Sequence, residues 1–533
     1  MSDSHDNNQT PPRRSPRVGV EIGGEQITLA EYYHRASSYQ PRAHLPGMPW
    51  RTCPSVYKTY RRRPTTALRE VRPSDGGTVL DATARWRSAP PRLAPSTMTF
   101  DDLSAILFHG QGITDVLKFG TMTYDLRAAP SAGALYPVDV YAVVSRVERL
   151  APGLYHHAIK EHSLVLLKEG DFSKELEKAA GCPHLYEPAA ATLLLSVMFA
   201  RSGVKYRERV YRYVNMDAGH VAYNLGVSAA ARGLGAPLVA RFDDGAINAL
   251  LEIDTEKEAA LLLMPLGKTA PDAKQTADLP EPPFAAVRPK PPESSARYVR
   301  MIHEGTSQRV GRGEGTLAAH SAHAGGADRA GTAREAATTP ADDPIALPDP
   351  AGGDALFPVI GRRRSTRDYS SAAMTQEELS ALCVAAAGDG ADEDPFHAVT
   401  APLNLYAAVR HVEGIEPGVY LFDPLARSLR LIRSGDFSAQ CKRANLNQDF
   451  CRTAHVVFFK TVTFDALGRP DGDRGYRYAN IRSGIMGGAL YLQATALGLG
   501  VCGVGAFMDD DVAAILGSDP LTEPVLYVTA VGK

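Results

Sequence analysis

The sequence is poor in cysteine and tryptophan, and no part of it is apolar over a long run. It has six cysteines and two tryptophans in 533 residues, and no Cys-x-x-Cys pair occurs. Scattered cysteines argue against structural zinc and against a disulfide framework, and they fit a reducing compartment. No window approaches the ~18 uninterrupted apolar residues of a membrane helix, and the polar N-terminus lacks the apolar segment of a signal peptide. We therefore expect a cytoplasmic protein that does not enter a membrane.

An excess of charge of one sign is also missing. The formal net charge is −2, and charged residues make up 22% of the chain, so the composition gives no reason to expect nucleic-acid binding. The hydrophobic fraction of 44% is enough for a sizeable core. The length predicts two or three domains.

An internal repeat organises the chain. At a constant offset of 265 residues, Tyr406 repeats Tyr141 and the terminal Gly532–Lys533 repeats Gly267–Lys268. The same offset relates residues 417–420 to 152–155, 476–478 to 211–213, and 498–500 to 233–235. A further match relates residues 374–380 to 98–104. We interpret the chain as a tandem duplication.

The repeat and the composition together predict the domain boundaries. We expect an N-terminal extension over 1–74, a first copy over 75–270, a Pro/Ala/Gly-rich linker over 271–350 and a second copy over 351–533. Within the linker, the periodic island 298–303 predicts a short docked helix. In the first copy we expect Thr99 to cap a helix, strands over 138–144 and 191–199, and a long helix over 217–235 that stops at Gly235.

The two copies differ in a loop whose composition suits a flat ligand. Residues 130–137 read Pro-Ser-Ala-Gly-Ala-Leu-Tyr-Pro, and such small side chains let a ligand approach main-chain groups closely. The counterpart, 395–402, lacks the serine, the glycine and the tyrosine. The second copy also replaces Lys205, Tyr206 and Asn224 by Pro470, Asp471 and Ala489. Taken alone, the loop is better explained as an ordinary loop before a strand, and it is the comparison of the two copies that favours a ligand.

The first copy, in turn, lacks a basic segment that the second copy keeps upstream of its residues 374–380. Residues 362–369 read Arg-Arg-Arg-Ser-Thr-Arg-Asp-Tyr, whereas the matching 87–91 read Arg-Ser-Ala-Pro-Pro. Arginine offers permanently charged, bidentate donors that suit a phosphate, although a short basic run can also be a solvated helix entry. Because each copy keeps what the other lost, we predict one composite site built from both.

These residues resemble the nitroreductase-like flavoproteins, and more closely the SagB/McbC-type azoline dehydrogenases of thiazole- and oxazole-modified peptides. The motifs are the loop 130–137, Lys205-Tyr206, Asp217-Ala-Gly-His220 and the Gly-Leu-Gly of 233–235. The resemblance covers both copies and implies an α+β sandwich with a largely antiparallel sheet in each. It further implies an intramolecular pseudo-dimer with FMN between the copies, at one complete site and one degenerate site.

Carried over to this chain, the resemblance assigns residues to each part of the flavin. The phosphate is expected at Arg363, Arg364, Ser365, Arg367 and Lys533. The isoalloxazine ring is expected against Pro130, Ser131, Gly133 and Ala134, with Asn224 in the same set. The reactive edge of the ring is expected at the backbone of Val504, Gly505 and Ala506. The substrate pocket is expected to include Tyr136 and Arg209, and no metal is expected.

The implied reaction aromatises a thiazoline or oxazoline ring. It removes a proton from one ring carbon and a hydride from its neighbour, and FMN accepts the hydride. The resemblance makes Lys205 and Tyr206 the catalytic pair, with the lysine as a base whose pKa is lowered by burial and the tyrosine as a relay or orienting group. From the residues alone, Lys205 near Glu208 is also compatible with an ordinary surface lysine.

Alternatives from other classes stay open at this point. One is a reductase of nitro or quinone substrates that uses NAD(P)H, and another is a flavin-free scaffold that binds a peptide or a partner. The partners expected for the dehydrogenase are an azoline-containing precursor peptide and a cyclodehydratase complex. The sequence leaves open the peptide's identity, the ring preference, a ribosomal or a carrier-bound substrate, one or two FMN per chain, and further association of the pseudo-dimer.

Overall fold

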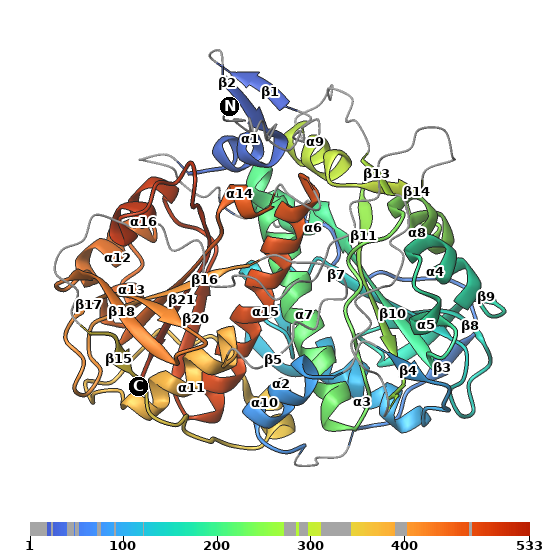
Figure 1. Ribbon diagram of the computed structural model, residues 1–533. Helices are drawn as coiled ribbons and strands as arrows, with labels where there is room; N and C mark the ends of the chain where they lie inside the picture. The colour runs from blue at the N-terminus through green and yellow to red at the C-terminus, as the bar shows by residue number, and fades with distance from the viewer. Residues whose placement is uncertain are drawn as a thin grey trace, which may run out of the picture.

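Two antiparallel sheets lie on either side of a pair of long central helices (Figure 1). This computed structural model describes residues 19–22, 25–39, 47, 53–71, 76–89, 92–120, 122–270, 284–286, 297–310, 343–389, 402–467 and 472–533. Three features considered above lie outside the described residues: the counterpart loop 395–401, residues 470 and 471, and most of the predicted linker.

The first copy folds around a sheet with the strand order β11-β10-β7-β8-β9-β3. The predicted strand over 138–144 is confirmed as β7, in which every side chain is buried, as expected for a valine-rich central strand. The strand predicted over 191–199 is confirmed as β10, which ends one residue earlier. The strands are β3 (Thr65–Ala67), β7 (Val138–Val144), β8 (Gly153–Ala158), β9 (Ser163–Glu169), β10 (Ala191–Met198) and β11 (Glu258–Leu266).

The second copy repeats this sheet with the order β15-β18-β17-β16-β19-β21-β20. Its strands are β15 (Ile345–Ala346), β16 (Asn404–Val409), β17 (Gly418–Asp423), β18 (Ser428–Ser434), β19 (Val456–Thr461), β20 (Gly500–Val504) and β21 (Val525–Gly532). Because β17 and β18 start 265 residues after β8 and β9, the register of the sequence repeat is also the register of the folds. The tandem duplication is confirmed.

The long helices α7 (Val210–Ala231) and α15 (Arg474–Ala496) cross at a pair of equivalent glycines. A Cβ added to Gly219 would lie 2.1 Å from the carbonyl oxygen of Ile481, and one added to Gly484 would lie 2.1 Å from that of Met216. Only glycine lets the two backbones approach this closely. The helices therefore form the centre of an intramolecular pseudo-dimer.

The boundaries of α7 differ from the predicted 217–235. The helix begins at Val210, and it ends at Ala231 because Gly233, and not Gly235, takes the left-handed conformation with φ 70°. Gly498, with φ 73°, does the same after α15. The predicted cap is confirmed: Thr99 accepts a hydrogen bond from the main-chain N–H of Asp102 at the start of α3 (Phe100–Gln111).

Two short helices outside the predicted copies pack on the central pair. α1 (Leu29–Ala36) and α9 (Arg297–Gly305) lie side by side at the top of Figure 1, with the rings of Tyr32 and Tyr298 5.9 Å apart. The helix predicted from the periodic island 298–303 is therefore confirmed as α9, which buries Val299 and Ile302. The linker region thus contributes a structural element to the core.

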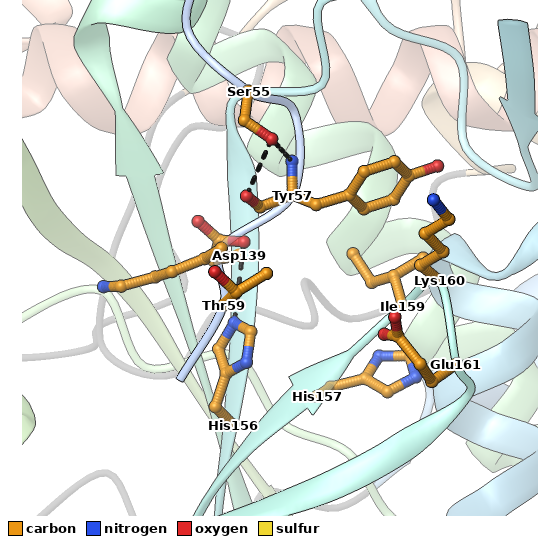
Figure 2. A pocket seen from close by; sticks show the side chains of 10 residues that line it. Ser55, Tyr57, Thr59, Asp139, His156, His157, Ile159, Lys160 and Glu161 are labelled. Carbon is orange, nitrogen blue, oxygen red and sulfur yellow. Dashed lines mark hydrogen bonds and ion pairs between the residues drawn. The ribbon is translucent and has the colours of Figure 1, made fainter. Parts of the chain in front are cut away.

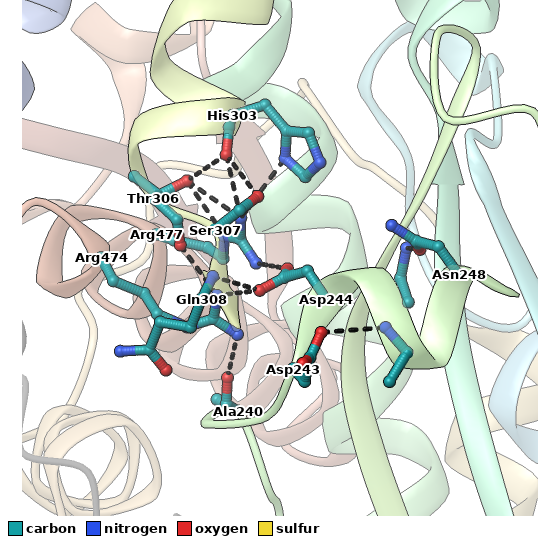
Figure 3. A network of polar contacts seen from close by, with 12 residues as sticks. Ala240, Asp243, Asp244, Asn248, His303, Thr306, Ser307, Gln308, Arg474 and Arg477 are labelled. Carbon is teal, nitrogen blue, oxygen red and sulfur yellow. Dashed lines mark hydrogen bonds and ion pairs between the residues drawn. The ribbon is translucent and has the colours of Figure 1, made fainter. Parts of the chain in front are cut away.

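α9 helps to hold a buried ion-pair network between the copies (Figure 3). Asp244 begins α8 (Asp244–Leu251) in the first copy, and its carboxylate binds Arg474 and Arg477 of α15. The carboxylate also accepts a 2.7 Å hydrogen bond from the main-chain N–H of Gln308, just beyond α9. Burial alone would raise the pKa of Asp244, but the two arginines lower it to about 2. The carboxylate is therefore ionised and tied to the other copy.

Shorter elements cover the sheets and their edges. The remaining helices are α2 (Val79–Arg87), α4 (Ser173–Ala180), α5 (Pro183–Tyr186), α6 (Phe199–Tyr206), α10 (Leu356–Arg362), α11 (Gln376–Ala387), α12 (Ser438–Ala444), α13 (Phe450–Thr453), α14 (Phe464–Leu467) and α16 (Asp509–Leu516). Two-stranded pairs join β1 (Gly19–Ile22) to β2 (Glu25–Thr28), β4 (Leu93–Ala94) to β12 (Lys268–Thr269), β5 (Ile113–Phe119) to β6 (Met122–Arg127), and β13 (Phe284–Ala286) to β14 (Gln308–Val310). Among the described residues, none of the helices combines the length and the apolar character needed to cross a membrane.

Candidate functional site

The predicted loop 130–137 connects β6 to β7 and is pinned to the central helix α7. Ser131 Oγ donates a 2.6 Å hydrogen bond to Asp217, and the N–H of Ala132 donates to the same carboxylate at 3.3 Å. Ser131 Oγ also accepts from the N–H of Tyr136 at 2.9 Å. Gly133, Ala134 and Tyr136 all have positive φ, so the loop is a tight turn that keeps its backbone close to its surroundings.

Asp217 orients this loop, although sequence reasoning gave it no role of its own. Its carboxyl group is buried, and burial raises its pKa to about 7 despite the hydrogen bonds from Ser131 and Ala132. The sequence could have indicated that Asp217 has a role specific to the first copy, because the second copy carries Arg482 at the equivalent position. The structure therefore adds a titratable group directly behind the loop.

Lys205 and Tyr206 end helix α6 and meet the loop at Gly133. A Cβ added to Gly133 would lie 3.1 Å from Lys205 Nζ and 3.0 Å from Tyr206 Oη, so the missing side chain makes room for both groups. Burial lowers the pKa of Lys205 and raises that of Tyr206. The amine lies 5.3 Å from the centre of the Tyr206 ring. The two predicted catalytic residues and the predicted loop are therefore together.

A stack of tyrosines connects this cluster to the second copy. The rings of Tyr206 and Tyr213 stack with their centres 3.9 Å apart. Tyr213 in turn lies against the backbone of Gly505, where an added Cβ would come within 2.3 Å of its ring. Of the segment Val504, Gly505 and Ala506, the backbone at Gly505 therefore packs directly against a tyrosine of the first copy.

The basic segment of the second copy meets the first copy differently from the expectation. The guanidinium of Arg363 is buried and donates to the carbonyl oxygens of Ala128 at 2.9 Å and Arg127 at 3.1 Å. Arg364 pairs with Asp115 at 3.0 Å. Both side chains therefore tie the segment to residues near the loop, through two main-chain carbonyls and one carboxylate. Neither presents an open guanidinium to a phosphate.

Ser365 and Arg367 are open to the expected phosphate, whereas Lys533 is half-buried and, like Arg364, pairs with a carboxylate. Ser365 and Arg367 are exposed, and Ser365 Oγ lies 3.0 Å from the hydroxyl of Tyr491. The Arg367 guanidinium lies 5.8 Å from the centre of the Phe450 ring. Lys533 Nζ lies 3.2 Å from Glu378. The main-chain carbonyl of Lys533 accepts a hydrogen bond from the N–H of Ser370, the residue after the basic segment 362–369.

Three predicted residues have structural partners instead of an open position. Asn224 donates to the carbonyl of His109 at 3.2 Å, so its amide packs α7 against α3. Arg209 is buried and binds Asp509 at 2.6 Å and the carbonyl of Gly505 at 3.2 Å. Arg209 is therefore an interface residue, as its persistence in the second copy as Arg474 could have indicated.

Tyr136 is 8% exposed and folds back under the loop, where its hydroxyl accepts from the N–H of Arg127.

The two copies differ in the segment that follows β20. At the positions equivalent to Gly505 and Ala506, the first copy carries Ala240 and Arg241, and Arg241 is buried. The first copy therefore has the larger side chain at both positions.

The side that contains the loop 130–137 offers groups that suit a flavin mononucleotide. It combines a turn of small residues with an exposed hydroxyl and guanidinium at Ser365 and Arg367, and a guanidinium suits a phosphate. At Gly503 an added Cβ would come within 1.9 Å of Tyr527 Oη, so the tyrosine packs directly against this strand.

Comparisons with known proteins agree with this architecture. A family model described as "Nitroreductase family" matches residues 84–268 and 360–533, which together exceed half of the chain. A solved protein titled "putative nitroreductase", from Anabaena variabilis ATCC 29413, superimposes with a TM-score of 0.73 and 27% identity over 95% of this chain and 99% of that one. The likeness therefore extends over both copies.

Two curated proteins are similar to single stretches of the chain. The "Putative nitroreductase MJ1384" of Methanocaldococcus jannaschii is 37% identical over 183 residues, which are 33% of this chain and 90% of that protein. The trifolitoxin-processing protein TfxB of Rhizobium leguminosarum bv. trifolii is 26% identical over 173 residues, or 31% of this chain. That match spans 46% of TfxB, less than half of its length.

Proposed function

Because the chain belongs to the nitroreductase family, we propose that it is an FMN-dependent oxidoreductase that dehydrogenates azoline rings in a ribosomally made peptide. The observation that carries this proposal is the convergence of Lys205 Nζ and Tyr206 Oη on Gly133 in one half-site. A reductase that only passes electrons from NAD(P)H to an acceptor needs no lysine base at that place, whereas the removal of a ring proton does.

In this mechanism each residue of the cluster has a distinct task. When bound, FMN would supply the hydride acceptor for the azoline ring. Lys205, whose lowered pKa favours the neutral amine, takes the proton from the neighbouring ring carbon. Tyr206 keeps its proton because burial raises its pKa, so its hydroxyl can donate a hydrogen bond that orients the ring. Asp217 holds Ser131 and Ala132, and thereby the loop that faces the site.

A relative of the chain suggests the substrate class and the partners. The similarity to a protein named for trifolitoxin processing favours a role in the maturation of a peptide. We propose that the partners are an azoline-containing precursor peptide and the cyclodehydratase that forms its rings. We also propose one FMN per chain, with its phosphate at Ser365, Arg367 and Lys533.

The test is a single turnover in the absence of oxygen. The purified chain, loaded with FMN, is mixed with a thiazoline-containing peptide. We expect the flavin absorbance at 450 nm to bleach while the peptide becomes lighter by two hydrogens, with one ring oxidised per flavin. A flavin that stays oxidised with this peptide and with its oxazoline analogue would refute the proposal.

The relative from Methanocaldococcus jannaschii favours a second candidate, a reductase of nitro or quinone compounds. In the same experiment, NADPH or NADH alone would then bleach the flavin absorbance within seconds. Menadione or a nitroarene would reoxidise the flavin and restore its absorbance. If the chain binds no flavin even after incubation with FMN, the scaffold alternative replaces both.

A further inference from the structure

The two copies bury different polar side chains. In the first copy, His156 Nε2 and the carboxylate of Asp139 face each other at 3.6 Å in the wall of a cavity of about 230 Å³ (Figure 2). Asp139 also pairs with Arg201 at 2.9 Å, so its charge is balanced within its own copy. In the second copy, Tyr491 of α15 is 3% exposed, and its hydroxyl reaches the basic segment 362–369. The proposed function gives Tyr491 no task.

The hydroxyl of Tyr491 joins two segments of the second copy. It accepts a 2.7 Å hydrogen bond from the main-chain N–H of Gly503 in β20, and it lies 3.0 Å from Ser365 Oγ in the basic segment 362–369. Gly503 directly precedes the segment 504–506, where the reactive edge of the flavin is expected. One phenol therefore stands between the serine expected at the phosphate and the strand end expected at the ring.

The packing around the ring of Tyr491 fixes the position of this hydroxyl. The guanidinium carbon of Arg363 lies 5.5 Å from the centre of the ring. The imidazole of His220, from α7 of the first copy, meets the ring edge-on with the ring centres 5.8 Å apart. Burial raises the pKa of Tyr491 to about 12, so the phenol keeps its proton at neutral pH. A buried phenol that keeps its proton needs an acceptor for it.

The chemistry of the partners indicates the directions of these hydrogen bonds. The N–H of Gly503 can only donate, so the oxygen of Tyr491 accepts from it. The thiol of Cys502 also interacts with this phenol, but sulfur is a weaker acceptor than the oxygen of Ser365. If Ser365 accepts the phenol proton, its own hydroxyl proton stays available for another acceptor. Ser365 is exposed, and an anionic oxygen from outside the protein would make the strongest such bond.

The first copy has a different side chain in this place. At the position of Tyr491 it carries Gly226, and a Cβ added to Gly226 would lie 2.1 Å from Cε2 of Trp86. The indole of Trp86 therefore fills the space beside the helix, and its N–H donates to the carbonyl of Ala236 at 2.9 Å. An aromatic ring packs at this position of both copies, but in the first copy the ring carries no hydroxyl.

We propose that Tyr491 is a positioning residue for the flavin phosphate: it donates its proton to Ser365 Oγ and thereby leaves the hydroxyl proton of Ser365 free for a phosphate oxygen. The inference rests on the proposed function, which supplies FMN and assigns its phosphate to the basic segment 362–369. It also gives a physical reason for one FMN per chain, because Gly226 in the first copy has no hydroxyl with which to orient a phosphate donor.

The first experiment compares two flavins that differ only in the phosphate. FMN and riboflavin are titrated into the flavin-free, full-length wild type and Tyr491→Phe, and the change in flavin fluorescence gives each Kd. We expect the wild type to bind FMN about a hundredfold or more tighter than riboflavin. Tyr491→Phe should bind FMN about tenfold more weakly and riboflavin as the wild type does. A purely structural role would weaken the binding of both flavins equally, and that result would overturn the proposal.

A double-mutant cycle then assigns the effect to the serine. Ser365→Ala should weaken FMN binding about 10–30-fold without changing that of riboflavin, and an unchanged Kd for FMN would refute the proposal even if Tyr491→Phe did not fold. The double variant should bind FMN as Ser365→Ala does, because Tyr491 acts through the serine. Additive losses would refute that link. Tyr420→Phe is the matched control: it removes another buried hydroxyl of the second copy, which donates to the carbonyl of Glu416 at 2.8 Å, and it should bind both flavins normally.

Flavin binding separates this inference from the proposed reaction. If the wild type prefers FMN, Tyr491→Phe loses that preference and the chain does not oxidise a thiazoline peptide, the proposed function fails and the role of Tyr491 stands. If the wild type binds FMN and riboflavin equally, no phosphate contact exists for Tyr491 to support, and the inference fails whatever the chain oxidises. If the wild type binds neither flavin, both proposals are refuted.

Discussion

Asp244 and Asp509 occupy equivalent positions in the two copies, and each carboxylate binds two arginines of the other copy. Arg209, just before α7, and Arg212 of α7 lie 2.6 and 2.9 Å from Asp509, while Arg474 and Arg477 of α15 bind Asp244. The main-chain N–H of Tyr39, just beyond α1, donates to Asp509 as that of Gln308 does to Asp244. The ion pairs are thus reciprocal, and neither copy can pair its buried arginines alone.

We expect Asp509→Asn to destabilise the protein strongly. Burial alone would raise the pKa of Asp509, but Arg209 and Arg212 hold it well below its ordinary value, so the group is charged at neutral pH. Removing that charge leaves two buried guanidiniums unpaired, at a cost of about 3–5 kcal/mol. Thermal unfolding measures the loss against Asp510→Asn, an exposed neighbour on α16. Similar melting temperatures for the two variants would contradict this account.

The crossing of the central helices makes Gly219→Ala a severe change. The new methyl group would lie 2.1 Å from the carbonyl oxygen of Ile481, so the helices must move apart. We expect a loss of about 3 kcal/mol or more in unfolding free energy. Gly361→Ala is the matched control, because nothing lies within 4 Å of the added methyl on helix α10. It should be neutral or stabilising by up to about 1 kcal/mol.

The raised pKa of Asp217 predicts an unusual pH dependence of stability. Burial raises this pKa from 3.8 to about 7 in the folded protein, so the folded state holds the proton more tightly than the unfolded state. The group's contribution is complete at pH values below its unfolded pKa and is lost as the pH rises toward 7, by up to about 1.4 kcal/mol per pH unit.

Asp217→Asn removes this titration. We expect the difference in melting temperature between wild type and variant to change steadily from pH 4 to pH 7 and to level off above pH 7. A difference that stays constant over this range would show that Asp217 titrates normally.

The proposed proton acceptor gives a kinetic prediction. Lys205→Met should lower the rate of azoline oxidation about 10²–10⁴-fold, the usual contribution of a positioned base, while FMN stays bound. Tyr206→Phe keeps the stack on Tyr213 and should have a smaller effect. Lys174→Met serves as the surface control. Rates measured in single turnover separate the chemical step from product release, and a normal rate in Lys205→Met would exclude the lysine as the base.

The basic segment 362–369 of the second copy gives a binding prediction that distinguishes Arg367 from Arg364. Arg367→Ala should weaken FMN binding about 10–100-fold, as expected for the loss of one charge-assisted hydrogen bond. Arg364→Ala should have little effect, because Arg364 pairs with Asp115. Flavin content after gel filtration and a fluorescence titration measure both. Equal weakening by the two variants would mean that Arg364 turns to the phosphate when FMN binds.

The sequence by itself determined the duplication, two central strands of the first copy and the difference in sequence between the half-sites. A constant offset of 265 residues relates the copies from residue 141 to the end of the chain, and the valine-rich segment 138–144 forms a buried strand. The convergence of the loop with Lys205 and Tyr206 was likewise expected from motifs that the chain shares with a family.

Only the tertiary structure decided what each polar side chain touches. Arg363, Arg209 and Asn224 looked like ligand-binding residues, yet a carbonyl or a carboxylate from a distant segment already holds each of them. The role of Asp217 was not found beforehand, because its partners Ser131 and Ala132 come from a separate loop. A guanidinium or a carboxylate has the same formula everywhere, and its role depends on the groups that folding brings within hydrogen-bonding distance.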